Sequence, residues 1–248
     1  MRLALIGCSL LTRELSEAVV RSPHLVDAQF LPEGLHETGA KTMRSRIQEA
    51  IDALDATKYD AVVLGYALCG NGLQGLTARQ VPLVLPRAHD CITLLMGSRT
   101  KYQEFFEANP GTYFRSAGWV ERAADLDDQL SGIGAGKDLN ALIEKYGEDS
   151  GRYLYQEMLS RFRQSYSKLV YIRTGLEPND SFLDRARAEA QEKKWIFEEV
   201  IGSPNLFRRL LAGDWLDDFL VVPPGYEVAA TYDEAIVTAV PNKRIPTE

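Results

Sequence analysis

The chain has 248 residues, of which 45% are hydrophobic and 25% are charged, the composition of an ordinary folded domain. A chain of this length can bury a large core without disulfides or a structural metal. Its formal net charge is −7, and it has no run of lysine and arginine that could follow a phosphate backbone. We therefore expect no nucleic-acid partner.

The chain has no apolar segment approaching the roughly 20 residues that span a bilayer. The opening residues MRLALIGCSL become polar too soon for a signal peptide. We therefore expect a cytoplasmic protein with no membrane partner. Its three cysteines are an odd number, and persistent disulfides are uncommon in a reducing compartment, so we expect thiols that are buried, metal-bound or reactive.

Short apolar runs alternate with helical patterns over the first ninety residues. The runs predict strands at 2–7, 25–31, 60–68 and 81–86. Apolar residues at three- and four-residue spacing predict helices at 11–20 and 43–54. This alternation is typical of a parallel sheet covered by helices.

The middle of the chain, from about residue 99 to residue 167, is charged and mostly helical in pattern. The α/β alternation then resumes, with strands predicted at 168–174, 195–201 and 218–225 and helices at 181–194 and 205–215. We expect an α/β fold with a mainly parallel sheet flanked by helices, a pattern also compatible with two Rossmann-like halves. The expected division is 1–115, 116–166 (helical) and 167–248, within one compact unit.

The three cysteines each follow a predicted strand. Cys8 comes after the first strand, Cys69 after the third and Cys91 after the fourth. In parallel sheets the carboxyl ends of the strands form the functional edge, so three neighbouring strands would bring the thiols to one crevice. The alternative is that each cysteine packs as a small apolar residue.

Three thiolates suit either an iron–sulfur cluster or zinc, and three protein ligands leave one coordination position open. A [4Fe–4S] cluster can be reached from three separate loops. The glycines Gly7, Gly70 and Gly72 would let the backbone approach its sulfides. A single zinc ion needs three sulfurs only about 3.5 to 4 Å apart. The cluster is the preferred cofactor, and zinc is the alternative.

Polar residues near the cysteines supply candidate catalytic groups. Arg87 and His89 precede Cys91 in PRAHDC, and His36 follows the second predicted strand. An arginine can clamp an anionic group, and a histidine can carry a proton. Asp90 is expected to cap the following helix, and Tyr66 is expected to pack in its strand.

Other motifs give no support for nucleotide or hydrolase chemistry. The segment SGIGAGKD, residues 131–138, lacks the spacing of a phosphate loop and is expected to connect to the next helix. The sequence has no G-x-G-x-x-G after a first strand, no G-x-S-x-G and no H-E-x-x-H. The absence of these motifs removes the main support for dinucleotide-binding, serine-hydrolase and metalloprotease functions.

Four segments resemble a bacterial and archaeal domain family of unknown function with recurrent cysteines. The most specific are GYALCGNGL and PRAHDCITLLMGS, which fit the motifs GYxLCGNG and PRxHDC; the others are AGW at 117–119 and GDWLDDFLVVPPG at 213–225. The resemblance extends from Cys8 to Gly225 and assigns the residues of these segments to one family pattern. It implies no activity.

Three functions are compatible with these features. The first is an enzyme whose [4Fe–4S] cluster on Cys8, Cys69 and Cys91 uses an open iron as a Lewis acid on a small-molecule substrate, as in a lyase or desulfurase-like reaction. The second is a zinc–thiolate protein for thiol activation or methyl transfer. The third is a small-molecule binding or accessory protein with structural cysteines. The oligomeric state does not follow from the sequence.

Overall fold

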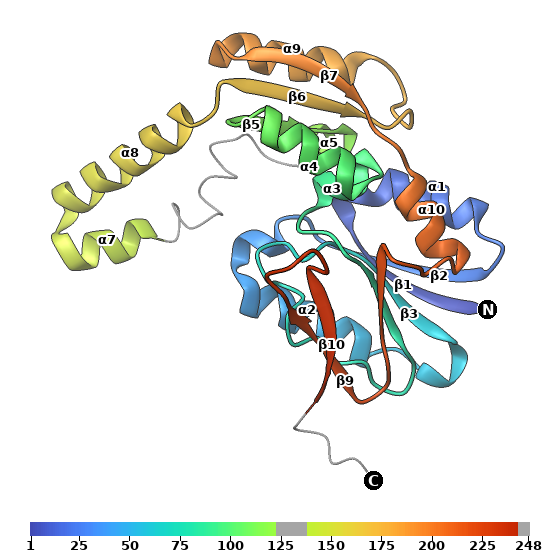
Figure 1. Ribbon diagram of the computed structural model, residues 1–248. Coiled ribbons are helices and arrows are strands. Elements are labelled where there is room, and N and C mark those ends of the chain that lie inside the picture. Colours follow the sequence, from blue (N-terminus) through green and yellow to red (C-terminus); the bar gives the residue numbers. More distant parts are fainter. Residues whose placement is uncertain (123–137, 243–248) are drawn as a thin grey trace. The chain divides into compact units, whose positions relative to one another are not determined.

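The computed structural model describes residues 1–122 and 138–242 (Figure 1). These residues form two compact units: unit 1 is Met1–Gln103 with Gly202–Glu248, and unit 2 is Glu104–Ile201. This grouping differs from the expected division at 115 and 166, because the last part of the chain returns to the first unit. Residues 123–137, which include the segment 131–137 and part of the middle region expected to be helical, lie outside the described residues.

Unit 1 is built on a five-stranded sheet in the order β2-β1-β3-β4-β8. Strands β1 to β4 are mutually parallel where they pair, and β8 runs antiparallel to β4. The structure thus confirms an α/β fold with a mainly parallel sheet. The strands are β1 (Arg2–Cys8), β2 (Leu25–Leu31), β3 (Ala61–Gly65), β4 (Leu83–Pro86) and β8 (Phe219–Val222).

One face of this sheet packs against helix α2 and the hairpin of β9 and β10. Alternate strand residues such as Ile6 and Leu64 share a core with Met43 and Ile47 of α2, because side chains of a strand alternate between its two faces. The sequence pattern does not predict the hairpin, whose strands lack a continuous apolar run. The elements are α2 (Ala40–Asp52), β9 (Tyr226–Ala230) and β10 (Val237–Pro241).

Helices α1 and α10 pack against each other and against strands of the sheet. Both lie on the side of the sheet away from α2 (Figure 1). Arg208 of α10 donates to Glu17 of α1 at 2.6 Å. The other helices of this part are η1 (Ser9–Leu11), α1 (Thr12–Arg21), η2 (Leu35–Thr38), η3 (Ala56–Lys58), α3 (Cys91–Met96) and α10 (Asn205–Ala212); α4 (Arg99–Ala108) is shared between the units.

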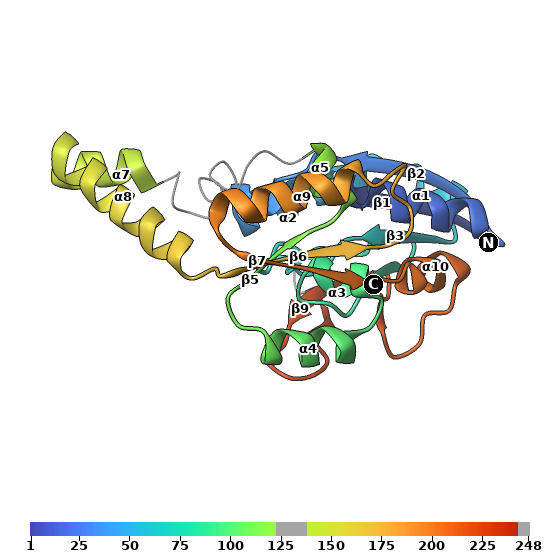
Figure 2. The same cartoon turned by 90° about the horizontal axis from the view of Figure 1, so that it is seen from above.

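Unit 2 has a three-stranded parallel sheet in the order β5-β6-β7, with α9 along it (Figure 2). Helices α7 and α8 lie side by side. The helical pattern of the middle region hides β5, which has only four residues. The elements are β5 (Thr112–Arg115), α5 (Ala117–Arg122), α7 (Asp138–Tyr146), α8 (Glu148–Gln164), β6 (Lys168–Arg173), α9 (Ser181–Lys193) and β7 (Ile196–Ile201). Across the described part of the chain, no helix has the length and apolar character needed to cross a membrane.

Candidate functional site

The three cysteines lie at one edge of the unit 1 sheet. Cys8 is the last residue of β1, Cys69 follows β3, and Cys91 begins α3 after β4. Because β1, β3 and β4 are adjacent parallel strands, the three loops leave the sheet at the same carboxyl edge. The placement predicted from the order of the apolar runs is therefore the one observed.

No disulfide joins the three cysteines, and their thiols act on one another electrostatically. Burial raises the pKa of Cys69 to about 12, with smaller contributions from Cys8 and Asp90. Burial also raises the pKa of Cys91, and the charges of Cys69, Asp90 and Cys8 add to this shift. Cys69 and Cys91 are therefore neutral thiols at pH 7, and their ionisation requires a nearby positive charge.

The loop that carries Cys69 has an unusual backbone. Cys69, Gly70 and Asn71 have φ values of 46°, 63° and 68°, three successive residues in the left-handed region. For residues other than glycine this conformation costs roughly 1 to 2 kcal/mol each. It is a strained arrangement of the kind found at functional sites.

Backbone hydrogen bonds tie this loop to the loop that carries Cys91. The Leu68 N–H donates to the Ala88 carbonyl at 2.9 Å, and the Cys69 N–H donates to the His89 carbonyl at 2.9 Å. These bonds fix the backbone next to Cys69 against residues that immediately precede Cys91. The two cysteine loops therefore form one connected structure.

The three predicted cofactor glycines have different surroundings. A Cβ at Gly7 would lie 2.6 Å from Leu15 Cδ1, and a Cβ at Gly72 would lie 2.2 Å from Met43 Sδ, so packing alone accounts for both glycines. Gly70 is exposed and has open space around its Cβ position. Of the three, Gly70 is the one at which the backbone is open to a ligand.

Tyr66 is a polar residue of the site that the sequence pattern assigns only to packing. It is 3% exposed, and its Oη has no hydrogen-bond partner among the described residues. Burial raises the pKa of the Tyr66 phenol, and the charges of Cys8 and Cys69 raise it further. A buried hydroxyl without a partner is unusual in a folded protein and marks a position where a ligand can bond.

Asp90 and Tyr102 fix the start of α3, where Cys91 lies. Asp90 is the N-cap: its Oδ1 accepts from the Thr93 N–H at 3.2 Å, which confirms the predicted cap. Its Oδ2 accepts from the Tyr102 Oη at 2.7 Å. Burial raises the pKa of Tyr102, and Asp90 contributes to the shift. The Asp90 carboxylate thus holds two elements at the thiol edge.

The two candidate histidines lie in loops at the same carboxyl edge. His89 is exposed and lies between β4 and Cys91. His36 lies in η2 after β2, the strand beside β1. The His36 side chain keeps much of its surface exposed, yet partial desolvation lowers its pKa. It is therefore neutral at pH 7 and able to accept a proton.

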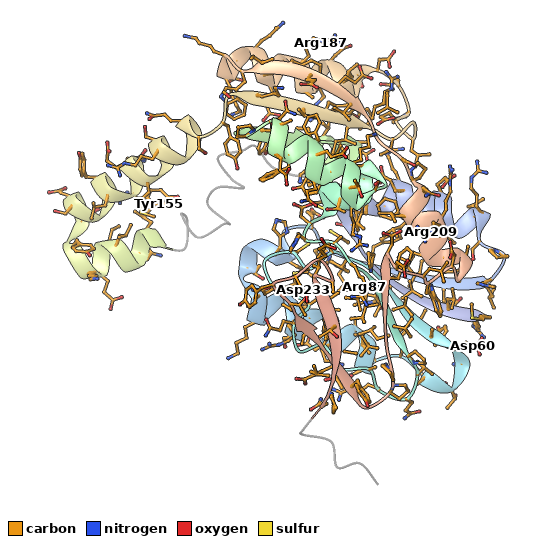
Figure 3. The ribbon with its side chains drawn as sticks, viewed as in Figure 1. Asp60, Arg87, Tyr155, Arg187, Arg209 and Asp233 are labelled. Carbon is orange, nitrogen blue, oxygen red and sulfur yellow. The ribbon has the colours of Figure 1, made fainter. Side chains whose placement is uncertain are left out.

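Arg87 has a structural role that the sequence does not reveal. Its Nε donates to the Phe219 carbonyl at 3.2 Å, and its Nη1 donates to the carbonyls of Ala235, at 3.0 Å, and Val237. Figure 3 labels Arg87 near β8 and Asp233 in the turn of the hairpin. The guanidinium joins β4 to β8 and to the hairpin, so its predicted use as an anion clamp competes with three carbonyl contacts.

Across residues 1–122 and 138–242, no group of three His, Cys, Asp or Glu side chains has the arrangement of a metal-ion site. The metal predicted from the cysteines stays a prediction. Two features of the edge suit a bound group: the Cys69 and Cys91 thiols, whose pKa values burial raises, and the Tyr66 hydroxyl, which has no partner among the described residues. Cys8 and Cys69 also pack partly against the apolar core of unit 1.

Comparison with known proteins places the chain in a family. The model of a family described as "Protein of unknown function (DUF1638)" matches residues 30–211, more than half of the chain. The chain belongs to the DUF1638 family. The matched DUF1638 range contains Cys69 and Cys91 and does not reach Cys8.

No curated protein matches this DUF1638 chain. Among solved structures, a chain described as "Crystal structure of sugar transporter from Clostridium phytofermentans" is 14% identical, with a TM-score of 0.29. The match covers 86% of this chain and 90% of that chain. A likeness of this size supports no functional inference, so the function of this DUF1638 protein has to be argued from its site.

Proposed function

We propose that the protein is an iron–sulfur enzyme in which Cys8, Cys69 and Cys91 hold a [4Fe–4S] cluster with one open iron. The observation that carries the proposal is the position of three cysteines at the carboxyl ends of three adjacent parallel strands. Ligands in open α/β sheets bind at this edge. The strained Cys69 loop, bonded to the loop before Cys91, supports the same proposal.

The cluster is preferred to a single zinc ion because of the spacing that each requires. Zinc needs three sulfurs about 3.5 to 4 Å apart, whereas a cluster holds its sulfurs around several metal atoms. The three cysteines come from three separate loops, an arrangement that suits the wider cluster. The zinc–thiolate alternative therefore has less support.

When bound, the cluster supplies Lewis acidity at its open iron. The chain's own residues supply proton transfer and binding. His36, which is neutral at pH 7, accepts a proton, and His89 lies exposed in the loop before Cys91. The proposed reaction class is that of a lyase or a desulfurase-like enzyme acting on a small molecule without net electron transfer.

A second candidate is a small-molecule binding or accessory protein with structural cysteines. The observation in its favour is that Cys8 and Cys69 pack against the core of unit 1, where free cysteines serve as small apolar residues. On this hypothesis a Cys→Ser change lowers stability and leaves ligand binding intact.

Anaerobic reconstitution with iron and sulfide tests the proposal. We expect about four irons and four sulfides per chain with visible absorption, and loss of iron in Cys69→Ser and Cys91→Ser.

His24→Asn is a matched control for His36→Asn, because His24 lies near Met1 at the opposite end of β1. Both histidine variants should keep iron, and only His36→Asn should lose turnover. A colourless, iron-free protein after reconstitution would contradict the proposal. A content of about one zinc per chain without sulfide would favour the zinc–thiolate alternative.

A further inference from the structure

The Tyr66 hydroxyl is surrounded by the protein and bonded to none of its described atoms. Its ring belongs to the apolar core between the sheet and α2 and is 3% exposed. Burying a hydroxyl without a partner destabilises the fold, whereas phenylalanine would fill the same core without that cost. Packing therefore does not explain why this position holds tyrosine and not phenylalanine.

The sheet register places Tyr66 beside Cys8. In the parallel pairing of β1 with β3, Gly7 is opposite Gly65; Cys8 is the last residue of β1, and Tyr66 directly follows β3. Tyr66 also lies in the apolar core cluster against which Cys8 and Cys69 pack. The charges of Cys8 and Cys69 both act on the phenol, which places two of the three thiols within electrostatic reach of it.

We infer that the Tyr66 hydroxyl donates a hydrogen bond to an oxygen atom of the substrate, in a hydroxyl or carboxylate group held beside the three thiols. The inference rests on the proposed function and narrows its substrate class. A phenol donates strongly to oxygen, and a thiol or thioether sulfur accepts only weakly. The site is therefore suited to a lyase acting on an oxygen-bearing compound, and the desulfurase-like reaction loses support.

The ligand test compares wild type with Tyr66→Phe after cluster reconstitution. Glycolate serves as the oxygen probe and 2-mercaptoethanol as the sulfur probe, each titrated against the visible absorption of the cluster. We expect Tyr66→Phe to raise the Kd for glycolate by about tenfold, because one hydrogen bond to a charged oxygen is lost. The Kd for 2-mercaptoethanol should stay within about twofold. Equal glycolate affinities in the two iron-loaded proteins overturn the inference and leave the proposed function standing.

A second measurement uses the cluster-free protein and does not depend on a ligand. Tyr66→Phe should melt at the same temperature as wild type or higher, since it removes a buried hydroxyl without a partner. Tyr102→Phe is the matched control: it deletes a hydroxyl that donates to Asp90 at 2.7 Å and should lower Tm. A decrease in Tm for Tyr66→Phe as large as that for Tyr102→Phe overturns the inference, because the hydroxyl is then bonded within the fold. Wild-type protein that binds no iron overturns the proposed function and the inference together.

Discussion

Cys69 combines a left-handed backbone with a thiol whose pKa is raised to about 12. An isolated buried thiol is inert, because the thiolate is the nucleophile and the metal ligand. Cys69 lies near two further thiols and a carboxylate, so at neutral pH it gains its charge only when a cation compensates it. The raised pKa is compatible with a metal ligand and unfavourable for a nucleophilic cysteine.

Alkylation of Cys69 by iodoacetamide should be slow in the metal-free protein. A thiol with a pKa near 12 has roughly a thousandfold less thiolate at about pH 8 than an ordinary cysteine. The rate should rise with pH without levelling off below about pH 11, because deprotonation is incomplete there. Peptide mass spectrometry over this pH range measures the rate, with denatured protein as the control. A plateau near about pH 8.5 in the folded protein would contradict the raised pKa.

The positions of the cysteines could be predicted from the sequence, and the state of Tyr66 could not. Continuous apolar runs reveal strands buried on both faces, and the residues after them fall at the carboxyl edge. Tyr66 belongs to such a run, and nothing in the run tells whether its hydroxyl finds a partner. The carbonyl contacts of Arg87 could not be predicted for a related reason: its partners lie in residues 219–237, far along the chain.

At the scale of elements, strands β1 and β3 pack closely against helix α1 at positions occupied by glycine. A Cβ at Gly65 would lie 2.6 Å from Leu15 Cδ1, and Gly7 meets the same atom. Leu15 is fully buried in the first helix, where it occupies the space that these two glycines leave. This contact sets how closely α1 packs beside the strand that ends at Cys8.

Gly65→Ala should lower the free energy of unfolding by about 1 to 3 kcal/mol, because the added methyl overpacks against Leu15. Leu15→Ala alone should cost about 2 to 5 kcal/mol through the cavity it leaves. Urea denaturation of the double variant should show a loss smaller than the sum, since each change relieves the other. Gly70→Ala is the control: it meets open space, so its strain should add independently to Leu15→Ala. Additive losses for Gly65 and Leu15 would contradict this packing.

At the scale of the whole molecule, the chain leaves unit 1, forms unit 2 and returns. The return brings β8 antiparallel against β4, with Leu83 opposite Val222, and adds α10 and the hairpin. The alternation of strands and helices predicts an α/β protein, but it does not reveal which strands share a sheet. That information lies in long-range pairing between residues more than a hundred positions apart, which local patterns do not record.

The two units should lose stability separately when their cores are damaged, because each has its own sheet and apolar cluster. Leu169 and Leu64 are fully buried in unit 2 and unit 1, respectively, and each change to alanine should cost about 2 to 5 kcal/mol. In hydrogen exchange by mass spectrometry, Leu169→Ala should accelerate exchange in β5, β6 and β7 by roughly thirtyfold or more and leave β1 and β3 near their wild-type rates. Leu64→Ala should give the reverse pattern. Equal acceleration in both sheets for either variant would show that the units unfold as one, because damage confined to one core would then reach the other.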